Sequence, residues 1–351
     1  MPIQPRPYLN QIAQLIFVLM GATAILYFSQ CILVPILFSL VLALLLLPLC
    51  RKIESIGSPK ALAATIGILL LITVFAVIFF VLYWQLSQLI QDSGQMRDKI
   101  DALIKQVQQN IDQKFGLPPR EQKKIIEQSN GNVMSSVSGV FGGLFGILVD
   151  IILVLVYIFL LLVFRSHLLT GLLKAVPDTQ RENVRKISRE AAGVSQQYLL
   201  GLAMMIGCLW VMYGIGFSLI GVKYAIFFAV LCGTLELIPF IGNLTGTILT
   251  VGISLVQGAS LGQVGGIVGI YAVVQFTQSY MLEPMIVGRQ VNLNPLTTIL
   301  CIVVFEAIWG VPGMVLAVPL TGMFKIACDH FEQLKPYGFL LGEVPKTKKA
   351  K

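Results

Sequence analysis

Residues 7–50 of the chain read PYLNQIAQLIFVLMGATAILYFSQCILVPILFSLVLALLLLPLC, a run without a single charged side chain. A helix needs about 20 mostly apolar residues to cross the hydrocarbon core of a bilayer. The run is long enough for two such helices, expected near 9–28 and 32–50. A cleaved signal peptide is not expected, because no small-residue cleavage site follows and the apolar sequence continues into a second span.

The composition of the whole chain agrees with this start. Of 351 residues, 56% are hydrophobic and 12% are charged, whereas soluble domains carry about 25% charged residues. We therefore expect an all-α, polytopic membrane protein. The net charge of +8 fits the retention of Lys and Arg on the cytoplasmic side. No basic stripe interleaves with aromatic residues, so a nucleic-acid partner is not expected.

The residues that usually hold metals or carry covalent catalysis are scattered. Six Cys lie in or beside apolar runs without a CxxC pair, and His167 and His330 are far apart. We expect the cysteines to behave as small apolar side chains, and we expect no metal site and no cofactor. No Walker A loop and no GxGxxG motif is present. These features argue against an enzyme and against ATP-driven transport within this chain.

Six more apolar segments follow the first two. They are expected near 61–84, 139–164, 198–220, 224–257, 262–282 and 296–328, which gives about eight membrane segments. The predicted layout has the first three spans in 1–84, a polar amphipathic helical insert in 85–132, the fourth span in 133–164, a basic cytoplasmic helix in 165–197, a transport core in 198–328 and a basic cytoplasmic tail in 329–351. The insert is interpreted either as a gate or assembly element, or as a solvated helix packed on itself or a neighbour.

Positive charge in the short loops predicts the orientation of the chain. Arg51, Lys52 and Lys60 lie between the second and third spans, and four lysines end the chain. Placing these groups inside the cell puts both termini in the cytoplasm, the insert outside and the basic 165–190 segment inside. The expected location is the inner (plasma) membrane.

Two of the apolar segments, 224–257 and 296–328, are longer than one span requires, and each is interrupted at its centre. The interruptions read ELIPFIGN at 236–243 and EAIWGVPG at 306–313. Proline and glycine should break each helix at mid-membrane depth. Freed backbone groups are tolerated there only where protein or a watery cavity satisfies them. Paired interrupted segments point to the binding site of a transporter. Each segment is expected to be either a bent span or a re-entrant hairpin, and two ordinary kinked helices without a substrate at the kink would leave the same pattern.

Three carboxyl groups fall inside apolar runs: Asp150, Glu236 and Glu306. A central charge costs roughly 2.5–3.5 kcal/mol on insertion scales. Glu236 or Glu306 is therefore a candidate for coupling transport to protons or a cation, and the alternative is a neutral carboxyl group with a structural role. Glu283, Arg289 and Asn294 lie between the two long segments. Arg289 is expected either to neutralise a carboxylate or to anchor a helix end at the headgroups.

These same motifs resemble those of the autoinducer-2 exporter family, also called predicted permeases. The resemblance rests on 236–243, on Pro284, Gly288 and Pro295, on Tyr157 through Pro177, and on the run GVPGMVLAVP at 310–319. It implies about eight membrane segments, a homo-oligomer, and either export of autoinducer-2 or sodium– or lithium–proton antiport. Many members have His where this chain has Asn294, and an Asn-rich run where it has Ser279 and Tyr280.

We therefore expect a transporter that exports a small polar organic solute such as autoinducer-2 by alternating access. The alternatives are a sodium– or lithium–proton antiporter, and a passive channel or membrane scaffold. The expected partners are this solute or ion, the lipid bilayer and further copies of the chain. The expected pathway residues are Glu236, Pro239, Gly242, Asn243, Glu306, Gly310, Pro312 and Gly313, and those expected to couple or pair charges are Asp150, Glu283, Arg289 and Asn294.

Overall fold

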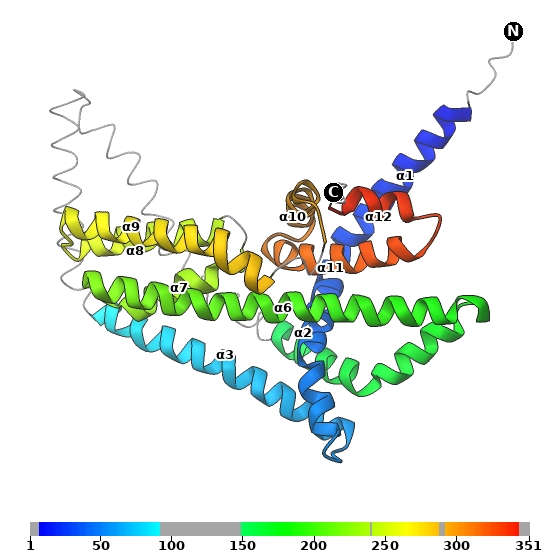
Figure 1. The fold of residues 1–351 in the computed structure, drawn as a ribbon, viewed down its shortest axis with the longest axis horizontal. Coiled ribbons are helices and arrows are strands. Elements are labelled where there is room, and N and C mark those ends of the chain that lie inside the picture. The colour runs from blue at the N-terminus through cyan, green and yellow to red at the C-terminus, as the bar shows by residue number, and fades with distance from the viewer. Residues whose placement is uncertain (1–6, 92–148, 239–240, 288–291, 344–351) are drawn as a thin grey trace, which may run out of the picture. The chain divides into compact units, whose positions relative to one another are not determined.

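The computed structural model of the chain describes residues 7–91, 149–238, 241–287 and 292–343, and nearly all of them are helical (Figure 1). The all-α prediction is confirmed. The fold divides into two compact units. The first unit comprises the described parts of Met1–Ile68, Leu153–Leu200 and Arg289–Lys351, and the second comprises those of Leu69–Ile152 and Gly201–Gly288. Each unit is described by itself below.

The helices follow the apolar runs of the sequence. Their bounds are α1 Pro7–Phe28, α2 Gln30–Glu54, α3 Lys60–Gln91, an unlabelled helix Val149–Lys174, α6 Asp178–Ile220, α7 Ala225–Leu235, α8 Ile241–Val256, α9 Leu261–Thr277, the π-helix η1 Gln278–Val287, α10 Pro295–Trp309, α11 Val311–His330 and α12 Lys335–Leu341. Within the described ranges, five helices are long and apolar enough to cross a membrane: α2, α3, Val149–Lys174, α6 and α11.

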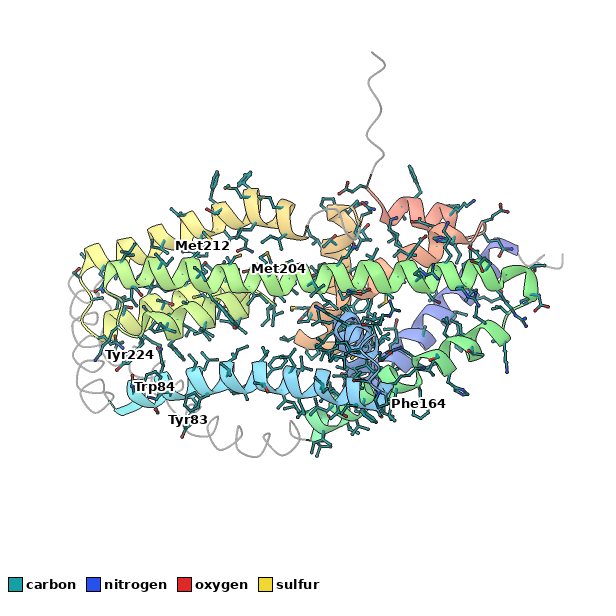
Figure 2. All side chains as sticks on the ribbon, turned by 60° about the horizontal axis from the view of Figure 1, so that its bottom comes forward. Tyr83, Trp84, Phe164, Met204, Met212 and Tyr224 are labelled. Atoms are coloured by element: carbon teal, nitrogen blue, oxygen red, sulfur yellow. The ribbon has the colours of Figure 1, made fainter. Side chains whose placement is uncertain are left out.

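Large apolar side chains cover the outer faces of these helices. Tyr83 and Trp84 on α3 and Met204 on α6 are 72%, 54% and 56% exposed (Figure 2). Polar residues such as Asn243 and Thr250 are buried instead. A water-soluble protein avoids large exposed apolar patches. The distribution is the one expected when lipid is the solvent and polar groups must be satisfied inside the protein.

The first predicted break separates α7 from α8, and the chain turns back on itself there. The Cys232 sulfur on α7 lies 3.7 Å from the Thr250 hydroxyl on α8. In one straight helix these residues would stand about 27 Å apart, at 1.5 Å per residue. Gly246 also packs directly on Cys232. The two helices therefore form a hairpin, and the predicted interruption at 236–243 is confirmed. Pro239 lies outside the described residues.

The second break is a single residue wide. Gly310 ends α10 and precedes α11 with φ +64°, in the left-handed region that favours glycine. Pro312 follows in the first turn of α11, where its missing N–H costs nothing. A Cβ on Gly313 would lie 2.0 Å from the Phe305 carbonyl oxygen. The Gly and Pro residues thus make the predicted interruption at 306–313, and glycine permits the close approach behind it.

Two sequence boundaries look different in the structure. The basic segment and the fifth span, which we divided between residues 197 and 198, are one continuous 43-residue helix, α6. No proline interrupts it, and each of its five glycines costs the helix only about 1 kcal/mol relative to alanine. The polar insert predicted at 85–132 begins on α3, which continues to Gln91. The rest of the insert lies outside the described residues.

In the first unit, a partly buried ion pair joins α2 to the helix Val149–Lys174. An Arg165 guanidinium nitrogen contacts a Glu54 carboxylate oxygen, with side chains 22% and 18% exposed. Close by, the Lys60 ammonium donates to the Ser166 hydroxyl over 2.7 Å. The loop after α2 and the segment that follows residue 165 therefore lie at the same end of this unit.

Replacing one partner of this pair should destabilise the fold. Arg165→Gln leaves the Glu54 carboxylate without its cation, and we expect a loss of about 3 kcal/mol. The control is Arg185→Gln, because Arg185 and Glu182 form an exposed pair worth at most about 1 kcal/mol. Thermal unfolding in mild detergent measures both. Equal melting temperatures for the two variants would contradict the structural role of the Arg165 pair.

The tight approach at the second break gives another prediction. Gly313→Ala places a methyl group against the Phe305 carbonyl, and overpacking of this kind costs about 1–3 kcal/mol. Gly252→Ala is the matched control, because no atom lies within 4 Å of a Cβ built there. We expect a lower melting temperature for the first variant and an unchanged or higher one for the second. A tolerated Gly313→Ala would show that the two helices do not pack as described.

Candidate functional site

The second unit holds the first break and the polar residues around it. The start of α7, at the other end of that helix from the break, is anchored by α3, whose Gln85 side chain is 7% exposed. The side-chain amide oxygen of Gln85 accepts a hydrogen bond from the Phe227 backbone N–H over 2.9 Å. Free N–H groups at a helix start need such a partner. Tyr224 turns the chain into α7 with φ +63°.

Glu236 follows the last residue of α7, at the break itself. Its carboxylate oxygen accepts a hydrogen bond from the Gln278 side-chain amide over 2.5 Å. Gln278 is 4% exposed and begins the π-helix η1. π-Helical turns are rare and are often found at functional sites. The wider helix begins at the residue that contacts the carboxyl group.

A second buried contact joins three helices just after the break. The Tyr213 hydroxyl of α6 donates to the Asn243 side-chain oxygen over 2.6 Å. The Asn243 amide nitrogen in turn donates to the Gln275 oxygen of α9 over 2.7 Å. Asn243, one of the predicted pathway residues, therefore ties α8 to both neighbours. Gly242 beside it packs so tightly on the Leu235 carbonyl that any side chain there would collide.

The arrangement suits a group that changes its charge. Glu236 is hydrogen-bonded to a neutral amide, which can serve a carboxylate as a donor and a protonated carboxyl group as an acceptor after it rotates. The carboxamide oxygen of Gln278 is buried and has no hydrogen-bond partner. Neither protonation state of Glu236 is excluded by this neighbour. Such a site can take up and release a proton or a cation.

The other carboxyl groups of the second unit have different surroundings. Glu283, five residues after Gln278 on η1, is near enough to Glu236 for their charges to interact. Asp150 lies exposed near the start of the helix Val149–Lys174. Arg289 lies outside the described residues. Glu283 is exposed, whereas Glu236 is partly buried, and no hydrogen bond joins the two side chains in the part of the chain that the structure describes.

The second break lies in the first unit, and its surroundings are less polar. Glu306 is exposed on α10, and its backbone carbonyl accepts the Gly310 N–H over 2.7 Å. Trp309 is buried, and its indole N–H donates to the Leu26 carbonyl over 3.0 Å. Gly310, Pro312 and Gly313 shape the turn. The side chain of Glu306 points away from the packed interior of this unit.

Asn294 is the N-cap of α10 in the first unit. Its side-chain oxygen accepts the Thr297 N–H over 2.8 Å, and its amide nitrogen donates to the Leu340 carbonyl of α12 over 3.1 Å. The backbone of Leu293 pairs with that of Gly342. Asn294 therefore fastens the C-terminal segment to the start of α10. An asparagine followed by proline at the first helical position is a sequence signal for this cap.

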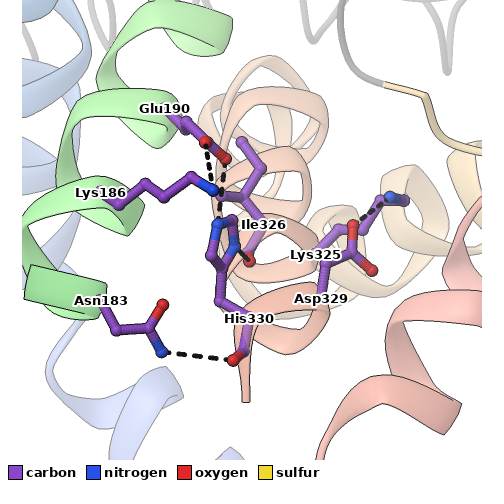
Figure 3. Close-up of polar contacts among 7 residues, drawn as sticks. All are labelled: Asn183, Lys186, Glu190, Lys325, Ile326, Asp329 and His330. Atoms are coloured by element: carbon purple, nitrogen blue, oxygen red, sulfur yellow. Dashed lines mark hydrogen bonds and ion pairs between the residues drawn. The ribbon is translucent and has the colours of Figure 1, made fainter. Parts of the chain in front are cut away.

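A second polar cluster of the first unit joins α6 to the end of α11 (Figure 3). The His330 ring nitrogen Nε2 lies 3.3 Å from a Glu190 carboxylate oxygen, and Asn183 donates to the His330 carbonyl over 3.3 Å. Lys325 and Asp329 pair over 2.5 Å and line two adjoining hollows of about 350 and 400 Å³. The His330–Glu190 and Asn183–His330 contacts join α11 to α6, whereas the Lys325–Asp329 pair lies within α11.

Comparison with known sequences identifies the family. The sequence model of the AI-2E family transporters matches residues 15–333. The chain belongs to the AI-2E transporter family. It is 26% identical over 321 residues to "Putative permease PerM" of Escherichia coli (strain K12), covering 89% of this chain and 90% of that one. It is 24% identical over 320 residues to "Putative transport protein YrrI" of Bacillus subtilis (strain 168), covering 87% and 88%. A "Putative transport protein" of Haemophilus influenzae is 27% identical over 330 residues, covering 90% and 92%.

This AI-2E family transporter is thus a multi-pass membrane protein of a permease family. Sequence reasoning singled out Glu236 and Asn243 but missed their partners, Tyr213, Gln275 and Gln278. The two glutamines had a visible signal, since they are uncharged amides spaced three residues apart within the apolar segment 262–282. Their contacts could not be inferred, because they depend on how α9 and η1 pack against the hairpin.

Asn294 both caps α10 and contacts α12, and two substitutions test these roles separately. Asn294→Ala removes the cap and the contact with Leu340, and the cap alone is worth about 1 kcal/mol. Asn294→Ser keeps a capping hydroxyl but is too short to reach α12. We expect the alanine variant to melt at a lower temperature than the serine variant, and we expect both to release the C-terminal segment to protease. Wild-type protease resistance in both variants would contradict this account of Asn294.

Proposed function

We propose that this transporter exports a small polar organic solute such as autoinducer-2 by alternating access, with Glu236 as the residue that couples transport to protons. The observation that carries the proposal is the Glu236–Gln278 hydrogen bond at the helix break. A charged group inside an apolar segment is costly. A carboxyl group held there by a neutral amide can relieve the cost by binding a proton and can release it in another state.

The hairpin of α7 and α8 supports a moving element at this site. Its two helices pack on each other through Cys232, Gly246 and Thr250, so they can shift as one body. Broken helices with their free ends at the substrate recur in secondary transporters. The Tyr213–Asn243–Gln275 contacts would then hold the hairpin in one of its positions.

A sodium– or lithium–proton antiporter is the second candidate. It is favoured by a second carboxyl group, Glu283, on the helix η1 that also carries Gln278, the hydrogen-bond partner of Glu236. Two carboxyl groups with carboxamide oxygens nearby provide the hard oxygen ligands that small cations prefer. The same carboxyl groups could exchange one cation for protons without a pocket for an organic solute.

The cytoplasmic location of both termini is part of the proposal. The contacts of Arg165 with Glu54 and of Lys60 with Ser166 bring together two basic segments. The positive-inside rule assigns each of them independently to the cytoplasm. Their shared position at one end of the first unit supports that orientation.

Proton flux in proteoliposomes tests the proposed function. The purified protein is reconstituted into liposomes that contain a pH-sensitive dye. Sodium, lithium, potassium and then autoinducer-2 are added outside in turn. We expect a saturable pH change with the organic solute that Glu236→Gln reduces at least tenfold. Glu306→Gln is the matched control and should keep most of the flux, because Glu306 is exposed on its unit.

The outcomes separate the candidates. A response to sodium or lithium alone, lost in Glu236→Gln, would establish the antiporter and overturn the export of an organic solute. Full activity of Glu236→Gln would overturn the coupling role of this residue. Flux that does not saturate would indicate a passive channel.

A further inference from the structure

Helix α8 is amphipathic, but its apolar face is exposed and its polar face is buried, which is the opposite of a surface helix in a soluble protein. Its apolar residues Leu244, Ile248 and Leu249 are 48%, 60% and 43% exposed. Its polar residues lie on the opposite, buried face, spaced by four, three and four positions, which is one side of an α-helix. We call these residues the α8 polar face: Asn243, Thr247, Thr250 and Ser254, each at most 5% exposed.

The polar face is only partly satisfied. Asn243 is bonded on both sides, and the Thr250 hydroxyl donates to the Gly246 carbonyl over 2.8 Å. The Ser254 hydroxyl is buried without any partner. The Thr247 hydroxyl lies beside the Cys232 thiol, which is a weak hydrogen-bonding group, and has no other hydrogen-bond partner.

Unused hydrogen-bonding atoms also lie just beyond each end of the face. The carboxamide oxygen of Gln278, next to Glu236, is a buried acceptor without a partner. The amide nitrogen of Gln257, three residues after Ser254, is a buried donor without a partner. A row of unused polar atoms therefore follows the helix from Glu236 past Ser254, and the face itself is about 16 Å long at 1.5 Å per residue.

Such a row is expensive unless something binds to it. A buried polar atom without a hydrogen bond costs about 1–3 kcal/mol, and lipid cannot supply the missing partner. Native proteins fill such positions with ordered water or a ligand. Threonine and serine can each donate and accept, so they fit molecules that do the same and carry no charge.

We propose that the α8 polar face is a hydrogen-bonding track for hydroxyl groups, occupied by water or by the hydroxyl groups of a neutral solute, that leads to Glu236. The track extends the site of the proposed function along the hairpin and rests on that function only for the role of Glu236. Thr247 and Ser254 provide the free hydroxyls, and the satisfied Thr250 lies between them.

Thiol labelling tests whether water reaches the α8 polar face. In a variant with the six native cysteines replaced, Thr247→Cys and Ser254→Cys are compared with Leu244→Cys and Ile248→Cys on the exposed apolar face. The reagent is a charged, water-soluble methanethiosulfonate, applied to proteoliposomes from both sides. We expect the two polar-face cysteines to react at least tenfold faster, because thiols ionise and meet the reagent only where water is present.

Added solutes distinguish water from a solute on the track. Xylitol serves as the hydroxylated probe, and glycine betaine at the same osmolality is the control. Protection of Ser254→Cys by xylitol alone supports a track that takes solute hydroxyls, and fast labelling unaffected by either supports a track filled with water. Labelling of Thr247→Cys and Ser254→Cys no faster than that of Ile248→Cys would overturn the proposal.

The labelling result is independent of transport. Suppose that the polar-face cysteines label fast and that the Glu236→Gln variant keeps full flux. The hydrogen-bonding track would then be supported, and the proton-coupling role of Glu236 would be overturned. Two flux variants add a matched comparison. Ser254→Ala removes a free hydroxyl of the track and should lower flux several-fold. Thr73→Val removes a satisfied hydroxyl outside the track, one that donates to the Leu69 carbonyl over 2.8 Å, and should leave flux nearly unchanged. Equal flux in these two variants would count against the track.

Discussion

The fold depends on one constraint, which is that a polar group inside an apolar segment must find its partner within the protein. The chain interrupts two of its apolar segments, at 236–243 and at Gly310, and at each place tight packing follows. Gly242 lies on the Leu235 carbonyl, and Gly313 lies on the Phe305 carbonyl. Only glycine allows this approach. The breaks are therefore stable because helices on both sides cover the freed backbone.

The same constraint explains the site in the second unit. Glu236 could not remain in an apolar segment without a hydrogen-bond donor, and Gln278 supplies it from the first turn of a π-helix. Asn243 is similarly held between Tyr213 and Gln275. These contacts use neutral amides and a hydroxyl, which stabilise a polar group without fixing its charge. These neutral contacts are the basis on which we propose that Glu236 carries a proton in this member of the AI-2E family.

Much of the architecture could be predicted from local sequence. The uncharged run from Pro7 to Cys50 indicated membrane helices, and Pro and Gly located both breaks, because these residues act on the backbone within one turn. The boundary between the basic segment and the fifth span did not appear, since α6 continues through it as one helix. A change of polarity along a helix alters what surrounds it but gives the backbone no reason to stop.

By itself, the sequence determined the all-helical membrane class, the two interruptions and the candidacy of Glu236, because length, hydropathy and backbone sterics are properties of short stretches. Only the tertiary structure decided that α7 and α8 fold into a hairpin and that Gln278 meets Glu236 across a separation of 42 positions. It also decided that the polar side of α8 faces inward, with Ser254 left unpaired. Contacts between distant segments depend on packing, which no local pattern specifies.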